Sequence, residues 1–171
     1  MQAENQAGNN TQPVTSSSEL QPEGAEHFTN LLNAYYGLKD AMIEGDATSI
    51  GIAAKKVSLI ASELEGSLDI DSVKKEILQP YIDTIRVSAH TIIAQKDETA
   101  EHQRIIFEQT SNAMYGAIKA AGYKSNQLYR QYCPMAMNDK GAYWLSNETE
   151  IRNPYFGSKM LECGEITDTL N

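Results

Sequence analysis

Residues 28–42 read FTNLLNAYYGLKDAM, and the apolar side chains of this stretch recur at the spacing of one face of an α-helix. The stripe consists of Phe28, Leu31, Tyr35 and Leu38, and Gly45 is placed to end the helix just beyond it. The pattern predicts an amphipathic helix over 26–44 that must bury its apolar face against other parts of the chain.

The same periodicity returns in three later segments and predicts helices over 47–65, 72–95 and 98–121. Asp46, Asp71 and Asp97 precede these segments, and an aspartate in that place can accept hydrogen bonds from the first backbone N–H groups of a helix. Pro80 removes one backbone donor and predicts a kink or a break in the third helix. Short connections between four such helices favour an up-and-down bundle. We expect the core to hold Leu31, Tyr35, Leu38, Val57, Ile60, Leu64, Ile85, Phe107, Met114 and Ile118.

The two ends of the chain differ from this helical part. Residues 1–24 are rich in Gln, Asn, Ser and Thr and lack Lys and Arg, which predicts a disordered polar tether ahead of one domain over 25–171. Such a tether is typical of an exported protein or lipoprotein that has lost its signal peptide. After Gly122, the alternating segment 127–133 and the short segment 142–145 predict a small β-hairpin.

The fold class expected is therefore all-α, an up-and-down four-helix bundle with a C-terminal extension that is irregular or a short β-hairpin. Residues 153–157, NPYFG, form a turn sequence with two large aromatic rings. Because such rings are poorly accommodated in water, we expect this turn to fold back onto the bundle.

Composition and motifs exclude several classes of function. The 171 residues include 23 acidic and 14 basic side chains, and the resulting net charge of −9 disfavours binding to nucleic acid or to anionic membranes. The sequence has no apolar run long enough to insert into a membrane. It contains no HExxH, GxSxG or glycine-rich phosphate loop, and no Glu-x-x-His pair of the kind found in di-iron bundles. We therefore expect a protein that is not an enzyme.

Sulfur is concentrated near the C-terminus. The chain has two Cys and six Met, and five of these eight side chains lie between positions 133 and 163: Cys133, Met135, Met137, Met160 and Cys163. In an extended segment, the first three would point to the same side. Met160 and Cys163 would share a face within one helical turn. Thiolates and thioethers are soft ligands that suit Cu(I), so the pattern favours a soft-metal site, with His90 or Trp144 as accessory groups.

The same residues allow a structural interpretation. A disulfide between Cys133 and Cys163 would close a loop of thirty residues and stabilise an exported protein by about 3 to 4 kcal/mol. The methionines would then be adaptable core residues. His90 and Trp144 would be ordinary buried side chains. The residues alone leave both interpretations open.

Three ordered strings carry a family resemblance: YCPMA at 132–136, GAYWLS at 141–146, and EIRNPYFGSKML at 150–161 followed by Cys163 and Gly164. Together they resemble the signature of a cell-envelope domain of unknown function of Bacteroidetes-type bacteria, found alone or fused to adaptor subunits of heavy-metal efflux pumps. YYxLKDA at 35–41 and QRxxF at 103–107 extend the resemblance over roughly 27–168.

The resemblance implies an all-helical domain, a periplasmic or cell-envelope location, and a role in copper or related metal handling. It also implies a heavy-metal efflux adaptor or another envelope protein as partner. It brings forward Cys133, Met135, Met160 and Cys163, whereas Met137 lies outside the CPMA string. The function expected is an accessory protein that binds copper or silver. The alternative is a structural or protein-interaction module of the envelope, without metal, stabilised by the Cys133–Cys163 disulfide.

Overall fold

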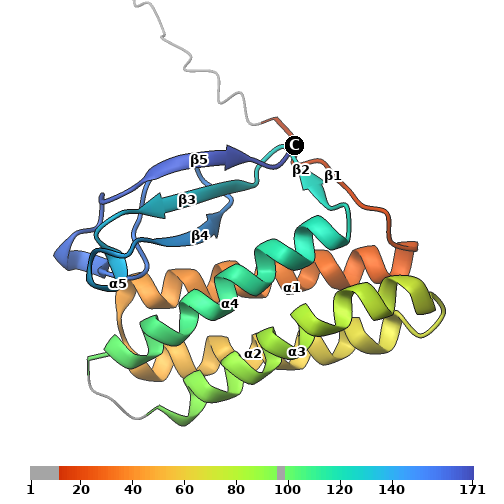
Figure 1. Ribbon diagram of the computed structural model, residues 1–171, viewed down its shortest axis with the longest axis horizontal. Helices are drawn as coiled ribbons and strands as arrows, with labels where there is room; N and C mark the ends of the chain where they lie inside the picture. The colour runs from red at the N-terminus through yellow and green to blue at the C-terminus, as the bar shows by residue number, and fades with distance from the viewer. Residues whose placement is uncertain (1–11, 96–98) are drawn as a thin grey trace, which may run out of the picture.

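The computed structural model describes residues 12–95 and 99–171. Four long helices come first: α1 (Pro22–Glu44), α2 (Ala47–Ser67), α3 (Ser72–Ala94) and α4 (Glu101–Ala120). They lie side by side in alternating directions, and a small sheet formed by the C-terminal residues lies over α1 and α4 (Figure 1). The up-and-down order of the four helices is as predicted.

The predicted helix ends are largely confirmed. The side chain of Asp46 accepts a hydrogen bond from the backbone N–H of Ser49 at 2.8 Å, and Asp71 does the same for Lys74 at 3.0 Å. Gly45 ends α1 with φ of 77°, in the left-handed conformation that glycine adopts without strain.

The start of the fourth helix differs from the prediction. Asp97 lies outside the described residues, and α4 begins at Glu101 rather than at 98. The residue in the cap position is Ala100, with φ of 59° and no side-chain hydrogen bond to the helix. The predicted cap at Asp97 is therefore wrong in position, because the chain turns into the helix three residues later.

Of the kink or break predicted at Pro80, the break does not occur, because α3 continues through this residue from Ser72 to Ala94. Pro80 and Glu76, whose carbonyl loses its helical partner, both lie on the exposed side of the helix. Water can hydrate that carbonyl there, so the missing backbone donor does not interrupt the helix.

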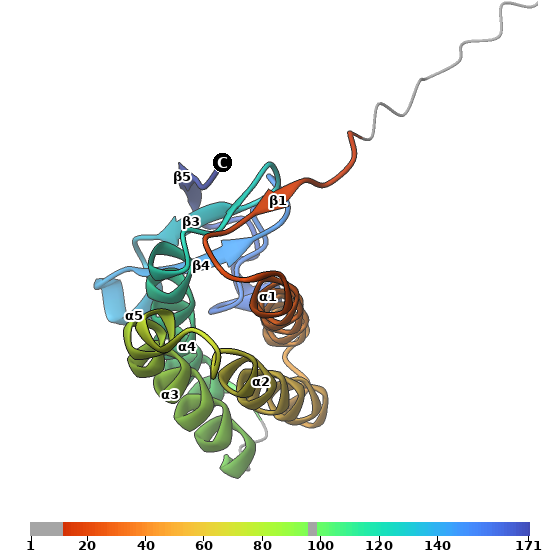
Figure 2. The same cartoon turned by 90° about the vertical axis from the view of Figure 1, so that its right-hand side faces the viewer.

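The bundle is open along one side. Each helix packs against the next one in the chain, whereas α1 and α4 hardly contact each other. The end view shows the C-terminal sheet over the seam between these two helices (Figure 2). The C-terminal extension therefore covers the side of the bundle that the four helices leave open.

The sheet has one strand more than predicted. Strand β3 (Tyr129–Cys133) pairs antiparallel with β4 (Ala142–Ser146), which confirms the hairpin. A third strand, β5 (Glu165–Thr169), pairs with the other edge of β3, so the order is β4-β3-β5. The short helical segment α5 (Ala136–Asp139) and the 3₁₀ turn η1 (Gly157–Lys159) lie in the connections. The predicted helical bundle with a short β extension is therefore compatible with the structure, and of this sheet only β5 escaped prediction, because EITDT is a mostly exposed and polar edge strand.

The N-terminal arm belongs to the folded domain from about residue 13 onward, so the predicted boundary at residue 25 is wrong. Strand β1 (Ser16–Ser17) pairs with β2 (Lys124–Ser125), Leu20 is buried in the core, and α1 begins at Pro22. Residues 1–11 of the predicted tether lie outside the described residues. Backbone pairing and one buried leucine are enough to fix a segment whose composition is polar.

Asn126 fastens this arm to the rest of the domain. Its Oδ1 accepts a hydrogen bond from the backbone N–H of Thr15 at 3.0 Å, and its Nδ2 donates to the carbonyl of Pro13 at 3.1 Å. Its own backbone N–H donates to the carbonyl of Thr15 at 3.2 Å. The arm is therefore held beside the C-terminal end of α4.

The predicted core is confirmed with one exception. Leu31, Tyr35, Leu38, Val57, Leu64, Ile85, Phe107, Met114 and Ile118 are buried, whereas Ile60 is only partly buried against them. Among the described residues, no helix is long and apolar enough to cross a membrane.

Tyr35 joins the bundle to the extension. Its ring stacks on Phe107 of α4 with 5.4 Å between the ring centroids. Its hydroxyl is 2.7 Å from the Oγ of Ser111 and accepts a hydrogen bond from the backbone N–H of Leu145 in β4 at 3.0 Å. One buried side chain therefore connects α1, α4 and the sheet.

Replacing Tyr35 with Phe should lower the free energy of unfolding by about 1 to 3 kcal/mol, because the N–H of Leu145 would be buried without an acceptor. Urea denaturation of the variant measures this loss. Tyr123→Phe is the matched control, since its hydroxyl contacts only Thr29 at a long 3.4 Å, and its loss should be clearly smaller. Equal losses in the two variants would contradict the role given to Tyr35.

Candidate functional site: a methionine-lined cavity beside a disulfide

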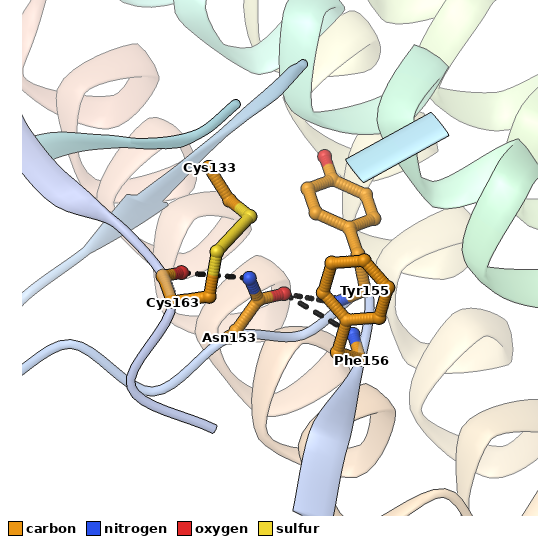
Figure 3. Close-up of a disulfide and its surroundings, with 5 residues drawn as sticks. All are labelled: Cys133, Asn153, Tyr155, Phe156 and Cys163. Atoms are coloured by element: carbon orange, nitrogen blue, oxygen red, sulfur yellow. Dashed lines mark hydrogen bonds between the residues drawn. A yellow bond between two sulfur atoms is a disulfide. The ribbon is translucent and has the colours of Figure 1, made fainter. Parts of the chain in front are cut away.

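The two cysteines form a disulfide. Cys133 ends β3 and is buried, Cys163 lies just before β5, and their Cα atoms are 5.7 Å apart (Figure 3). This confirms the disulfide that the sequence left as the alternative. A disulfide sulfur is a poor metal ligand compared with a thiolate, so the predicted five-sulfur site loses Cys133 and Cys163 in the oxidised protein.

Asn153 organises the chain around the disulfide. Its buried amide donates to the carbonyl of Cys163 at 2.8 Å, while its Oδ1 accepts from the backbone N–H groups of Tyr155 at 2.8 Å and Phe156 at 3.1 Å (Figure 3). This local turn directs the Tyr155 ring onto Phe107, with the ring centroids 5.8 Å apart. The aromatic turn therefore folds back on the bundle, as predicted.

The three C-terminal methionines line a single cavity of about 770 Å³ between the extension and the start of α4. Met135 and Met137 reach it from the segment after β3, and Met160 from the segment after η1. The α4 side contributes His102, and the remaining lining residues are Glu101, Arg104, Ile105, Glu108, Ala136, Asn138, Asp139, Lys140, Tyr155 and Phe156. Three of the five predicted sulfur ligands thus line the same cavity, and one of them, Met135, is 47% exposed.

The backbone at Met135 and Met137 differs from the extended segment that the sequence predicts. The extended spacing of Cys133, Met135 and Met137 does not exist, because β3 ends at Cys133 and the chain turns into α5. Met137 and the next two residues have φ values of 54°, 56° and 62°, in the left-handed region. Non-glycine residues pay roughly 1 kcal/mol or more each for this conformation, and such strained backbone is concentrated at functional sites.

Arg104 lines the cavity and links α4 to α1. Its Nε and Nη2 donate hydrogen bonds to the carbonyl of Met42 in the last turn of α1, at 3.1 and 2.7 Å. A cation in this position compensates the partial negative charge of the helix end. Partial burial lowers the pKa of the guanidinium, which nonetheless stays charged. Arg104 therefore connects α4 to α1 beside the cavity.

The predicted accessory residues lie elsewhere. His90 is exposed on α3, where its Nε2 is 3.1 Å from the hydroxyl of Ser58, and Trp144 is buried in the core against Tyr155. Neither lines the cavity. The histidine that does is His102, which the sequence places on a helix surface like any other polar residue. The sequence does not show which end of α4 packs against the C-terminal extension, so it does not indicate that His102 lines the cavity.

The cavity lining contains soft donors beside charged groups. No cluster of three or more His, Cys, Asp or Glu side chains suited to a metal ion occurs in residues 12–95 and 99–171. The lining includes three thioethers and one imidazole, together with three carboxylates, from Glu101, Glu108 and Asp139, and the cationic side chains of Arg104 and Lys140. The three thioethers distinguish this lining from sites made of carboxylates and histidines alone.

Fold and cavity together define a helical domain with a disulfide-closed, methionine-lined extension. A family model described as "Protein of unknown function (DUF3347)" matches residues 31–126, more than half of the chain, and the chain belongs to this family. The match covers α2 to α4 and most of α1, and ends before β3. No curated protein and no solved structure matches the chain. The expected bacterial group and metal association are not part of the family match.

Reducing the disulfide should lower the free energy of unfolding by about 3 to 4 kcal/mol, because the unfolded chain regains the freedom of a thirty-residue loop. Urea denaturation with and without dithiothreitol measures the difference, and mass spectrometry after alkylation counts the thiols. Two free thiols in the untreated protein would contradict the disulfide.

The protein should lose stability steeply above pH 10. Burial raises the pKa of the hydroxyls of Tyr35, Tyr36 and Tyr155 above the ordinary value of 10.0. The unfolded chain therefore releases these protons first, and the stability present below pH 10 is lost as the pH rises, by about 1.4 kcal/mol per pH unit for each tyrosine. Denaturation curves between pH 9 and 12 measure the slope.

Tyr36→Phe is the informative variant for this slope, because the Tyr36 hydroxyl is buried without a hydrogen-bond partner. Its replacement removes one titrating group and breaks no hydrogen bond. The slope of the variant should be shallower by about 1.4 kcal/mol per pH unit. An unchanged slope would show that Tyr36 ionises equally in both states.

Proposed function

We propose that this domain binds a soft metal ion, Cu(I) or Ag(I), at the methionine-lined cavity, as an accessory protein of the bacterial cell envelope linked to heavy-metal efflux. The observation that carries this proposal is the convergence of Met135, Met137 and Met160 on one cavity from two separate segments of the extension. The metal is cargo in this proposal, and the domain has no catalytic role.

The donor set supports a monovalent soft ion. Thioether sulfur is neutral and polarizable, so it suits Cu(I) and Ag(I) and competes poorly for Mg²⁺, Ca²⁺ or Zn²⁺. Met135, Met137 and Met160 would hold the ion, and the imidazole of His102 would supply a nitrogen ligand on the α4 side. The backbone strain of the turn at Met137 is consistent with a side chain held in place for such a purpose.

The redox chemistry of the two kinds of sulfur supports an envelope location. Disulfides persist in oxidising compartments, and thioethers cannot form disulfides with one another there. A site built from methionine therefore keeps its ligands under conditions that convert a pair of cysteines to a disulfide. The resemblance to domains fused to efflux adaptors is the reason to propose such an adaptor, or another envelope protein, as partner.

The alternative function is a module that only binds other proteins. The disulfide and the aromatic turn would then shape the extension without any metal. Ile70, Val73 and Ile77, which are exposed where α2 connects to α3, would supply apolar surface for a partner. Metal titration distinguishes the two functions, because a module that only binds other proteins is not expected to bind metal at the methionine cavity.

Replacing Met135 and Met160 together with Leu should weaken Cu(I) binding at least about tenfold, because two thioethers are lost while side-chain volume is nearly kept. The free energy of unfolding should change by less than about 1.5 kcal/mol. Competition with a coloured Cu(I) chelator, on protein with its disulfide intact, measures the affinity.

Met114→Leu is the matched control, since Met114 is buried in the bundle core away from the cavity. Its Cu(I) affinity should equal that of the unmodified protein. Equal affinity in the double variant, or no Cu(I) binding by the oxidised protein at all, would overturn the proposed function and favour the module without metal.

A further inference from the structure

Arg130 on β3 lies between two tyrosine rings, away from the methionine cavity. Its guanidinium carbon is 3.9 Å from the ring centroid of Tyr115 on α4 and 3.7 Å from that of Tyr143 on β4. Each of the two tyrosine rings has a further neighbour. Tyr132 packs on Tyr143 with centroids 4.5 Å apart, and the Nζ of Lys119 is 5.6 Å from the centroid of Tyr115. The plane of the guanidinium is therefore fixed from both faces.

The N–H groups of this guanidinium lack acceptors. Nε is buried without a hydrogen-bond partner, and within the described ranges no ion pair or hydrogen bond involves the Arg130 side chain. Arg86 differs, because its guanidinium donates to the carboxylates of Glu65 and Asp83. A partly buried guanidinium whose donors lack acceptors is unfavourable, and a ligand that supplies oxygen acceptors relieves this.

We infer that Arg130 and Lys119 form a binding site for an oxyanion, a carboxylate or a phosphoryl group. Since both faces of the guanidinium are covered by rings, a ligand can approach only its edge, where the terminal NH₂ groups offer two parallel donors. That fork matches the two oxygens of a carboxylate or phosphoryl group. Lys119, one helical turn from Tyr115, adds a second positive charge on the α4 side.

Asp168 should weaken the binding of an anion at this site. It is the register partner of Arg130 across the β3–β5 pair, yet no ion pair joins the two side chains. Its carboxylate, in a chain of net charge −9, opposes the approach of an anion. The site therefore selects by the shape of the guanidinium edge, and its affinity for small oxyanions should lie in the millimolar range.

The test is an NMR titration of ¹⁵N-labelled protein, following the Nε–H signal of Arg130, with inorganic phosphate, acetate and a short acidic peptide in separate arms. We expect a saturable shift in at least one arm. Tighter binding of phosphate identifies a phosphoryl ligand, and tighter binding of the peptide identifies the carboxylate of a partner protein. Sodium chloride at equal ionic strength is the control for general screening.

Arg130→Lys keeps the positive charge and loses the fork, so it should weaken binding by about tenfold or more, as read from the shifts of neighbouring backbone signals. Lys119→Gln should weaken binding severalfold while Arg130 stays between its rings, and Asp168→Asn should tighten it. Arg86→Lys, the same change at an arginine that already has partners, should have no effect. Absence of a saturable shift in all three arms, or equal binding by Arg130→Lys, would overturn the inference.

Discussion

Tyr35 of α1 and Phe107 of α4 stack across the seam where these two helices otherwise make few contacts. The position of the C-terminal sheet on the bundle depends on this aromatic pair. The hydroxyl of Tyr35 fixes one backbone N–H of β4, and the Tyr155 ring also packs against Phe107. Because the sheet is held here, the disulfide that ends β3 is held as well. The cavity lies between this anchored extension and the first turns of α4, and both contribute residues to its lining.

Local sequence patterns predicted the parts of the fold that depend on local interactions. Helical stripes, the caps at Asp46 and Asp71, and the β3–β4 hairpin each arise from residues close together in the chain. Strand β5 and the arm with β1 escaped prediction, because each is fixed by pairing with residues far away in the sequence. For the same reason the sequence indicated the methionines of the cavity but not His102, whose role depends on which end of α4 meets the extension.

The two kinds of sulfur, predicted as one site, have different chemical states in the structure. The cysteines form a disulfide that closes the loop carrying Met135 and Met160, and the backbone N–H of Cys163 donates to the carbonyl of Met160 at 3.2 Å. The family match stops at residue 126, which places His102 inside it and all three methionines outside. Part of the cavity lining therefore lies within the family match and part lies outside it, so relatives that share only the helices need not share the methionines.

The attachment of the N-terminal arm by Asn126 has a mechanical consequence. The arm is fastened beside the C-terminal end of α4 (Figure 1). The cavity is lined by residues of the N-terminal part of the same helix. A helix of 20 residues is about 30 Å long, and this length separates the two. Tension applied through the arm would be carried by Asn126 and the β1–β2 pair, far from the methionines. A molecule held by its N-terminus would thus point the cavity outward at its distal tip and keep the shape of the cavity undisturbed.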